Sequence, residues 1–231
     1  MIKTTKIIQR YIFITLDSSL TMKLEPFNAT FQQEDDSCYA VTLKVILDKL
    51  AVAHNKLELR GISVHKLNSI CGYKKGFAVM GDSVIGLDRL YNKYLKKNGY
   101  TIKRGDNGLL DLNNLIPILN NNNFSPPIVS VGEKYYTEHN KGYHVSEVNT
   151  LEYQHQLIVN DIHKDTDEIE LFDPDTPRLR QHNESINKNG LVKIPISHFI
   201  DYWDSTKRDT IWITKGKEEP TLEAGQKGLI K

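Results

Sequence analysis

The fold is decided by the stretch Gln32-Gln33-Glu34-Asp35-Asp36-Ser37-Cys38-Tyr39-Ala40-Val41, in which a polar, turn-forming run leads to a single cysteine. Beyond it, apolar residues recur at helical spacing, at Leu43, Ile46, Leu47 and Leu50. Asp36 or Ser37 is a suitable N-cap, because a short side-chain oxygen can accept from the unpaired N–H groups of a first helical turn. Cys38 is therefore predicted to lie in the first turn of a helix that ends near Leu50 or Ala53.

A cysteine in the first turn of a helix is a candidate nucleophile. The helix dipole favours negative charge at this end, and the thiolate is the reactive form of cysteine. Gln32, six residues upstream, carries amide N–H groups suited to stabilise an oxyanion beside the sulfur. The alternative is a buried structural cysteine, the more common fate of a free thiol. A nucleophilic role for Cys38 therefore requires a base and an orienting carboxylate downstream.

Composition limits the classes of function that the chain can have. Its 231 residues hold 30 basic and 29 acidic side chains without a basic block, so we expect no nucleic-acid partner. The 2 cysteines exclude a disulfide framework, and Cys71 lies in an apolar helical pattern typical of a core residue. The apolar run from Tyr11 to Leu16 is too short for a signal peptide, and no segment is long enough to cross a membrane. We therefore expect a cytoplasmic protein without membrane contact.

The sequence indicates neither a metal nor a cofactor. Cysteine and histidine show no paired ligand spacing such as C-x-x-C or H-x-x-x-H. The glycines at positions 72, 76 and 81 form no phosphate-binding fingerprint. The expected partner is a peptide or protein substrate, and the sequence leaves the oligomeric state open.

Local patterns predict a single α+β domain over residues 1–214, with a helical half of about residues 24–123 and a sheet half of about residues 124–214. Helices are expected after three caps, at Ser63, Ser83 and Asp111, the last helix being bent or shortened by Pro117. Strands are expected at residues 6–16, 100–103, 126–131, 153–162, 168–173, 191–194 and 209–214, with a short helix at 197–203. Residues 132–151 are predicted to be a polar insertion or a long loop, and residues 215–231 a disordered tail.

A candidate base and its orienting group lie on the predicted hairpin. His155 opens one strand, Asp173 closes the next, and a turn-like segment at 164–167 joins them. With the turn centred near Asp165, residues 157 and 173 are opposite each other. His155 and Asp173 then share a face as diagonal neighbours about 7–8 Å apart, and a slip of one residue would move Asp173 to the other face. The alternatives are a half-buried structural histidine and an aspartate that only forms a turn before Pro174.

The order of these residues resembles that of the papain-like cysteine peptidases, and most closely the bacteriocin-processing (double-glycine) peptidase domains. The similarity covers roughly residues 24–214. It includes a Gln followed six residues later by a Cys at a helix start, a His that opens a strand, and an Asp-Pro that closes the next strand. The resemblance implies a papain-like fold in which Cys38 is the nucleophile, His155 the general base, Asp173 the orienting carboxylate and Gln32 the oxyanion-hole residue.

The chain departs from these relatives at three positions near the catalytic residues. Tyr39 follows the nucleophile, where a small residue or Trp is usual, and Gln156 follows His155, where an aromatic or aliphatic residue is usual. Thr42 replaces the second cysteine common in the bacteriocin branch. The resemblance implies a hydrolase that cleaves a peptide or isopeptide bond. The alternatives are an acyltransferase using the same triad and a catalytically inactive binding module.

Overall fold

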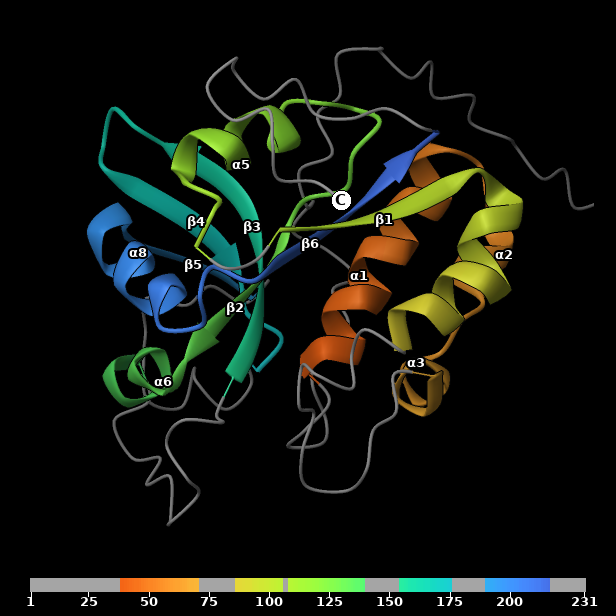
Figure 1. Cartoon of the computed structure of the whole chain (residues 1–231), viewed down its shortest axis with the longest axis horizontal. Coiled ribbons are helices and arrows are strands. Elements are labelled where there is room, and N and C mark those ends of the chain that lie inside the picture. The colour runs from red at the N-terminus through yellow and green to blue at the C-terminus, as the bar shows by residue number, and fades with distance from the viewer. Residues whose placement is uncertain (1–37, 71–85, 106–107, 140–153, 176–189, 217–231) are drawn as a thin grey trace, which may run out of the picture.

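An antiparallel sheet of six strands forms the centre of the protein (Figure 1). The computed structural model describes residues 38–70, 86–105, 108–139, 154–175 and 190–216. The strands are β1 (Tyr100–Gly105), β2 (Ile128–Gly132), β3 (Gln154–His163), β4 (Glu168–Phe172), β5 (Leu191–Pro195) and β6 (Thr210–Lys215). They lie in the order β1-β6-β2-β3-β4-β5, and every neighbouring pair is antiparallel. With helices on its faces, the protein is of the α+β class predicted from the sequence.

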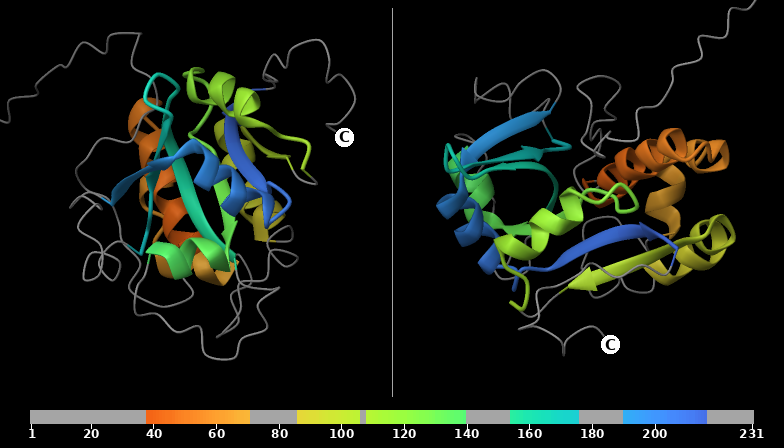
Figure 2. Two further views of the ribbon diagram at one scale, coloured as in Figure 1. Left: turned by 90° about the vertical axis from the view of Figure 1, so that its left-hand side faces the viewer. Right: turned by 90° about the horizontal axis from the view of Figure 1, so that it is seen from above.

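Helices cover both faces of the sheet (Figures 1 and 2). One face packs against α5 (Leu112–Leu119), α6 (Glu133–His139) and α8 (Ile196–Asp204). The other packs against α1 (Cys38–Ala53), α2 (Leu57–Arg60), α3 (Val64–Ile70) and the helical segment 86–98, which ends in η1 (Tyr91–Leu95) and η2 (Lys96–Asn98). Because side chains alternate along β3, Leu157 and Val159 enter the first core, whereas Ile158 enters the second.

The central helix α1 is held in place by burial along most of its length. Leu43, Ile46, Leu47 and Leu50 are fully buried, and the helix packs against α2, α3 and β3. Burying side chains of this size stabilises a fold by about 1.5–3 kcal/mol each. The first residue of α1 is therefore fixed relative to the strand that carries His155.

The β3–β4 hairpin contains a bulge that sets the position of Asp173. Near the turn at residues 164–167, His163 lies opposite Glu168, but beyond the irregularity between Val159 and Asp161 the register moves by one residue. Ile158 then lies opposite Phe172. Continued by one step, this register puts Asp173 opposite Leu157, as predicted, and on the same face of the sheet as His155.

Many sequence predictions of secondary structure are confirmed. The cap at Ser63 accepts from the Lys66 N–H, Asp111 and Asn114 form a capping box, and Gly99 ends its helix with a positive φ of 77°. Pro117 lies within α5, which still runs to Leu119. The predicted strand at 6–16, residues 140–151 of the predicted loop, and the predicted tail beyond Gly216 lie outside the described residues.

One expectation about the described residues is wrong. The predicted loop 132–151 begins with the last residue of β2 and then forms helix α6, because Tyr135 has a buried partner to pack against. The strand expected at 100–103, within the predicted helical half, is β1, which pairs along its whole length with β6. The two predicted halves therefore share one sheet.

Among the described segments, no helix combines the length and the hydropathy that a membrane span requires.

Candidate active site

His155 and Asp173 form a buried pair at one end of the sheet. His155 is the second residue of β3, and Asp173 follows the last residue of β4. His155 Nε2 lies 2.9 Å from Asp173 Oδ1, and both side chains are almost completely excluded from solvent. The Asp173 backbone N–H donates to the Gly190 carbonyl at 2.8 Å, which fixes the chain where β4 ends. The two residues that the sequence placed on one face are therefore in direct contact.

Cys38 contacts the same histidine. It is the first residue of α1 and is 7% exposed. Its thiol and the His155 ring share a hydrogen bond. Because Nε2 faces Asp173, Nδ1 is the ring nitrogen left for the sulfur. The first N–H groups of a helix have no intrahelical acceptor, so they give the sulfur an electropositive surrounding.

The charges of the pair shift the ionisation of both partners. Burial by itself would lower the pKa of His155, but the Asp173 charge and hydrogen bond, followed by those of Cys38, raise this pKa to about 10. Burial likewise opposes ionisation of Asp173, yet the charge and hydrogen bond of His155, the Asp175 N–H and the Tyr135 hydroxyl hold the pKa of this carboxyl below its usual value. At neutral pH the pair is therefore a carboxylate and an imidazolium.

Tyr135 is a third buried side chain in contact with this pair. Its hydroxyl donates to Asp173 Oδ2 at 2.8 Å, and its ring stacks on that of His155 at a centroid distance of 6.0 Å. Tyr135 was not predicted as a site residue, because it lies within the segment expected to be a loop. Its aromatic side chain in a mostly polar stretch was an available signal, but the sequence did not indicate what the side chain contacts.

Close packing between α6 and α8 positions Tyr135. A Cβ atom on Gly132, the residue before α6, would lie 2.3 Å from Ser205 Oγ and 3.2 Å from Ser205 Cβ. Ser205 follows α8, and its hydroxyl donates to the Tyr202 carbonyl at 2.6 Å. The start of α6 therefore touches the end of α8 without room for another atom.

We expect Gly132→Ala to displace α6 and to lower the free energy of unfolding by about 1–3 kcal/mol, the usual effect of overpacking. Thermal unfolding of the variant measures the loss. Ser205→Ala in the same chain should recover part of it, because the closer of the two contacts disappears. Gly61→Ala is the matched control, since a Cβ atom there meets only the Glu58 carbonyl oxygen at 3.8 Å. Equal stability of the Gly132 and Gly61 variants would contradict the close contact.

Two further histidines of the described segments are not part of the Cys38–His155–Asp173 contact. Gln32, the predicted oxyanion donor, and Cys71 lie outside the described residues. His163 lies at the far end of β3 beside Asp161, and His198 is exposed on α8. Of the histidines in the described segments, His155 is thus the one that touches both a cysteine and a carboxylate.

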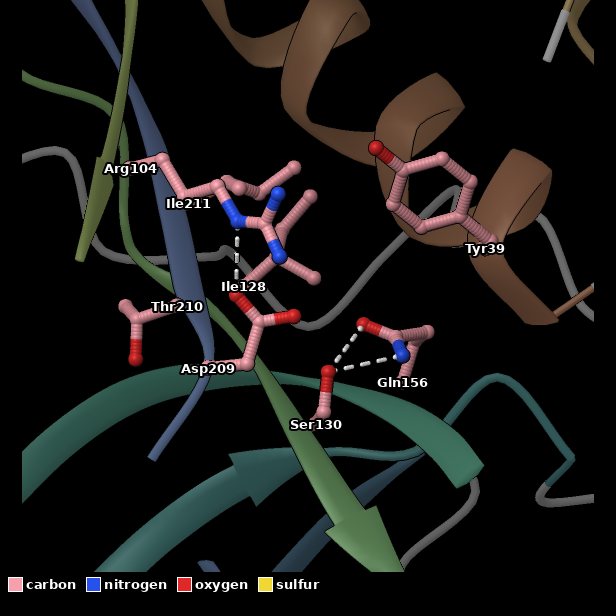
Figure 3. A pocket seen from close by; sticks show the side chains of 8 residues that line it. All are labelled: Tyr39, Arg104, Ile128, Ser130, Gln156, Asp209, Thr210 and Ile211. Carbon is pink, nitrogen blue, oxygen red and sulfur yellow. Dashed lines mark hydrogen bonds and ion pairs between the residues drawn. The ribbon is translucent and has the colours of Figure 1, made fainter. Parts of the chain in front are cut away.

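Figure 3 shows a small pocket that Gln156 helps to line. Because neighbouring side chains of a strand point to opposite faces, this pocket lies on the other face of β3 from His155. It is lined by Tyr39, Arg104, Ile128, Ser130, Gln156, Asp209, Thr210 and Ile211. Gln156 Nε2 donates to Ser130 Oγ at 2.9 Å, and Arg104 Nε donates to Asp209 Oδ1 at 3.0 Å. The space has room for about one water molecule. The unusual residues Tyr39 and Gln156 therefore belong to the packing behind the catalytic candidates.

Thr42, the third unusual residue, also has a local structural role. It is fully buried in α1, and its hydroxyl donates to the Tyr39 carbonyl at 2.9 Å. None of the three departures from the family pattern removes a member of the Cys38–His155–Asp173 contact.

No family model matches the chain, and no curated protein matches it. The function of the protein is therefore inferred from the chemistry of the side chains at this site.

Proposed function

We propose that the protein is a papain-like thiol hydrolase that cleaves a peptide or isopeptide bond. The observation that carries the proposal is the contact of Cys38, at the N-terminus of a 16-residue helix, with a histidine whose other ring nitrogen lies 2.9 Å from a buried carboxylate. This is the nucleophile, base and orienting group that covalent acyl transfer requires. A long buried helix packed against an antiparallel sheet supports the papain-like fold.

The proposed reaction begins with attack on the substrate carbonyl. The Cys38 thiolate forms a C–S bond with the carbonyl carbon, and the π electrons of the carbonyl move to its oxygen. The Cys38 backbone N–H, with the Gln32 side chain as a second donor, stabilises the resulting oxyanion. The C–N bond then breaks, and the His155 imidazolium gives its proton to the departing amine.

Hydrolysis of the thioester completes the cycle. Neutral His155 accepts a proton from water as the water oxygen attacks the thioester carbonyl. The C–S bond breaks, the acid product leaves, and the thiolate–imidazolium pair is restored. Throughout, Asp173 holds the His155 ring in one orientation and stabilises its cationic form.

The proposal predicts that Cys38 reacts selectively with iodoacetamide at pH 6. An ordinary thiol, with a pKa near 8.5, is almost entirely protonated there, whereas a thiolate paired with an imidazolium reacts readily. Intact mass and peptide mapping should show Cys38 alkylated before Cys71. We expect His155→Ala to slow this reaction about tenfold or more.

Two controls make this experiment specific. His163→Ala removes a histidine from the same strand and should leave the alkylation rate unchanged. In denaturant, Cys38 and Cys71 should react alike. If native Cys38 is no faster than Cys71, or if His155→Ala has no effect, the hydrolase proposal fails and a binding module is the better interpretation.

Product analysis then separates hydrolysis from acyl transfer. A peptide substrate found by screening would be incubated with and without added hydroxylamine. A hydrolase gives the free acid in the absence of the amine, and hydroxylamine diverts part of the acyl group to a hydroxamate. A product formed only when an amine is present would identify an acyltransferase.

A further inference from the structure

Tyr135 contacts both members of the ion pair. It lies in the first turn of α6 and has no exposed surface. Its hydroxyl donates to Asp173 Oδ2 at 2.8 Å, while its ring lies nearly parallel to that of His155, at an interplanar angle of 19°. One side chain thus contacts the carboxylate through its polar end and the imidazole through its aromatic face.

The Asp173 carboxylate is held from two sides. Oδ1 accepts from the Asp175 backbone N–H at 2.8 Å and faces His155, whereas Oδ2 accepts from Tyr135. A carboxylate bound through one oxygen alone can rotate about its terminal bond, which is a broad torsion. The hydroxyl of Tyr135 opposes that rotation and keeps Oδ1 directed at His155.

Tyr135 is itself held by α8. Its ring meets the edge of the Tyr202 ring at a centroid distance of 5.5 Å and an interplanar angle of 79°. The Tyr202 hydroxyl donates to Glu138, and Lys134 lies over the Tyr202 ring. The titratable groups that face Tyr135 are therefore Asp173 and Asp175 after β4, His155 on β3 and Tyr202 on α8.

We propose that Tyr135 is a positioning residue for the catalytic pair, which holds Asp173 through its hydroxyl and His155 through its ring. The inference rests on the proposed thiol hydrolase function, to which it adds a residue beyond Cys38, His155, Asp173 and Gln32. In this role Tyr135 takes no proton in the reaction. It acts by keeping the carboxylate ionised and aligned with the imidazole.

The test compares Tyr135→Phe with Tyr202→Phe. The first variant keeps the stacked ring and removes the donor to Asp173. The second removes a neighbouring buried phenol hydroxyl that donates to Glu138. Two measurements are made on each: the pH dependence of Cys38 alkylation by iodoacetamide, and the proton resonance of the His155 ring N–H that faces Asp173. That resonance is identified in ¹⁵N-histidine-labelled protein by its absence from His155→Ala.

We expect Tyr135→Phe to move the acidic limb of the alkylation profile upward by about one pH unit, because the hydroxyl that favours ionised Asp173 is gone. The ring N–H resonance should also shift. Tyr202→Phe should leave both unchanged, although each variant unfolds at a lower temperature than the wild type. Tyr135→Leu, which also lacks the ring, should slow alkylation further.

The outcomes separate this inference from the proposed function. If wild-type Cys38 depends on His155 but folded Tyr135→Phe has the wild-type profile and resonance, the positioning role is wrong and the hydrolase proposal stands. If Tyr202→Phe shifts both measurements as far as Tyr135→Phe, the effect is general packing and the positioning role is again wrong. If wild-type Cys38 is unreactive while the Tyr135→Phe resonance moves, Tyr135 positions the pair and the hydrolase proposal fails.

Discussion

Asp173→Ala is expected to lower the free energy of unfolding by about 3–5 kcal/mol and to slow alkylation of Cys38 at pH 6 by about tenfold or more. Asp173 is fully buried, and its side chain accepts from the Asp175 N–H and the Tyr135 hydroxyl while pairing with His155. Alanine removes that acceptor from all three groups and leaves a cavity. Without the carboxylate, burial is the dominant influence on His155 and lowers its pKa.

Asp173→Asn separates charge from orientation. Asparagine has almost the same shape and can still accept from the His155 ring, and a Cys-His-Asn set is a working form of this chemistry. We therefore expect Asp173→Asn to fall between the wild type and Asp173→Ala in both stability and alkylation rate. Urea unfolding and the alkylation assay give the two quantities.

Asp165→Ala is the matched control, because it removes a carboxylate from the exposed turn of the same hairpin. It should change the unfolding free energy by less than about 0.5 kcal/mol. If folded Asp173→Ala alkylates at the wild-type rate, the carboxylate does not support the imidazolium, and the triad as proposed is wrong.

The contact between His155 and Asp173 could be predicted because period-2 alternation and a clear turn define a hairpin. The predicted register depended on a turn centred near Asp165. The observed turn pairs His163 with Glu168, and a regular ladder from that pair would put Asp173 opposite Ile158, on the wrong face. The bulge at Asn160 restores the predicted partner. This bulge could not be predicted, because β3 contains no glycine or proline that would indicate an irregular strand.

Helix α6 could not be predicted because its stability comes from distant partners. Its sequence, Glu133 to His139, is polar and has no apolar residues at helical spacing. Tyr135 is buried by contact with residues more than 15 positions away in the chain, on β3, β4 and α8. Tertiary packing therefore stabilises a helix here, although the local sequence pattern does not favour one.

The position of strand β1 in the sheet could not be predicted from local sequence either. The pattern at residues 100–103 predicted a strand, but nothing local indicated that it pairs with β6, where Thr101 lies opposite Thr214. A strand can be predicted from alternation, whereas its neighbour in the sheet depends on pairing across more than 100 residues. Local patterns therefore indicated the β3–β4 hairpin, but neither its bulge nor the order of the strands in the sheet.

The stability of the protein is expected to fall as the pH rises from about 6.5 to about 10. The pKa of His155 is raised to about 10 in the folded protein, from 6.5 in an ordinary environment. Between these values the folded state binds a proton that the unfolded state has lost. Stability then falls with increasing pH, by at most about 1.4 kcal/mol per pH unit.

At low pH, Asp173 has the opposite effect: its contribution makes the stability of the protein rise with increasing pH. Its pKa is below the ordinary value of 3.8, so its stabilising contribution is present above that value and is lost as the pH falls through the folded-state pKa. The contribution of the ion pair should therefore be largest between about pH 4 and pH 6.5.

The cleanest measurement compares Cys38→Ala with Cys38→Ala/His155→Gln by urea unfolding at a series of pH values. Removing the thiol from both chains eliminates its contribution, and ionisable groups that do not contact His155 contribute equally and cancel in the difference. The charge and hydrogen bond of Asp173 remain in the first chain and still raise the pKa of His155. The difference in unfolding free energy should be greatest near pH 6 and should decline steadily toward pH 10. A difference that stays constant or grows above pH 6.5 would mean that His155 is neutral in the folded protein, and the thiolate–imidazolium pair would then have no cation.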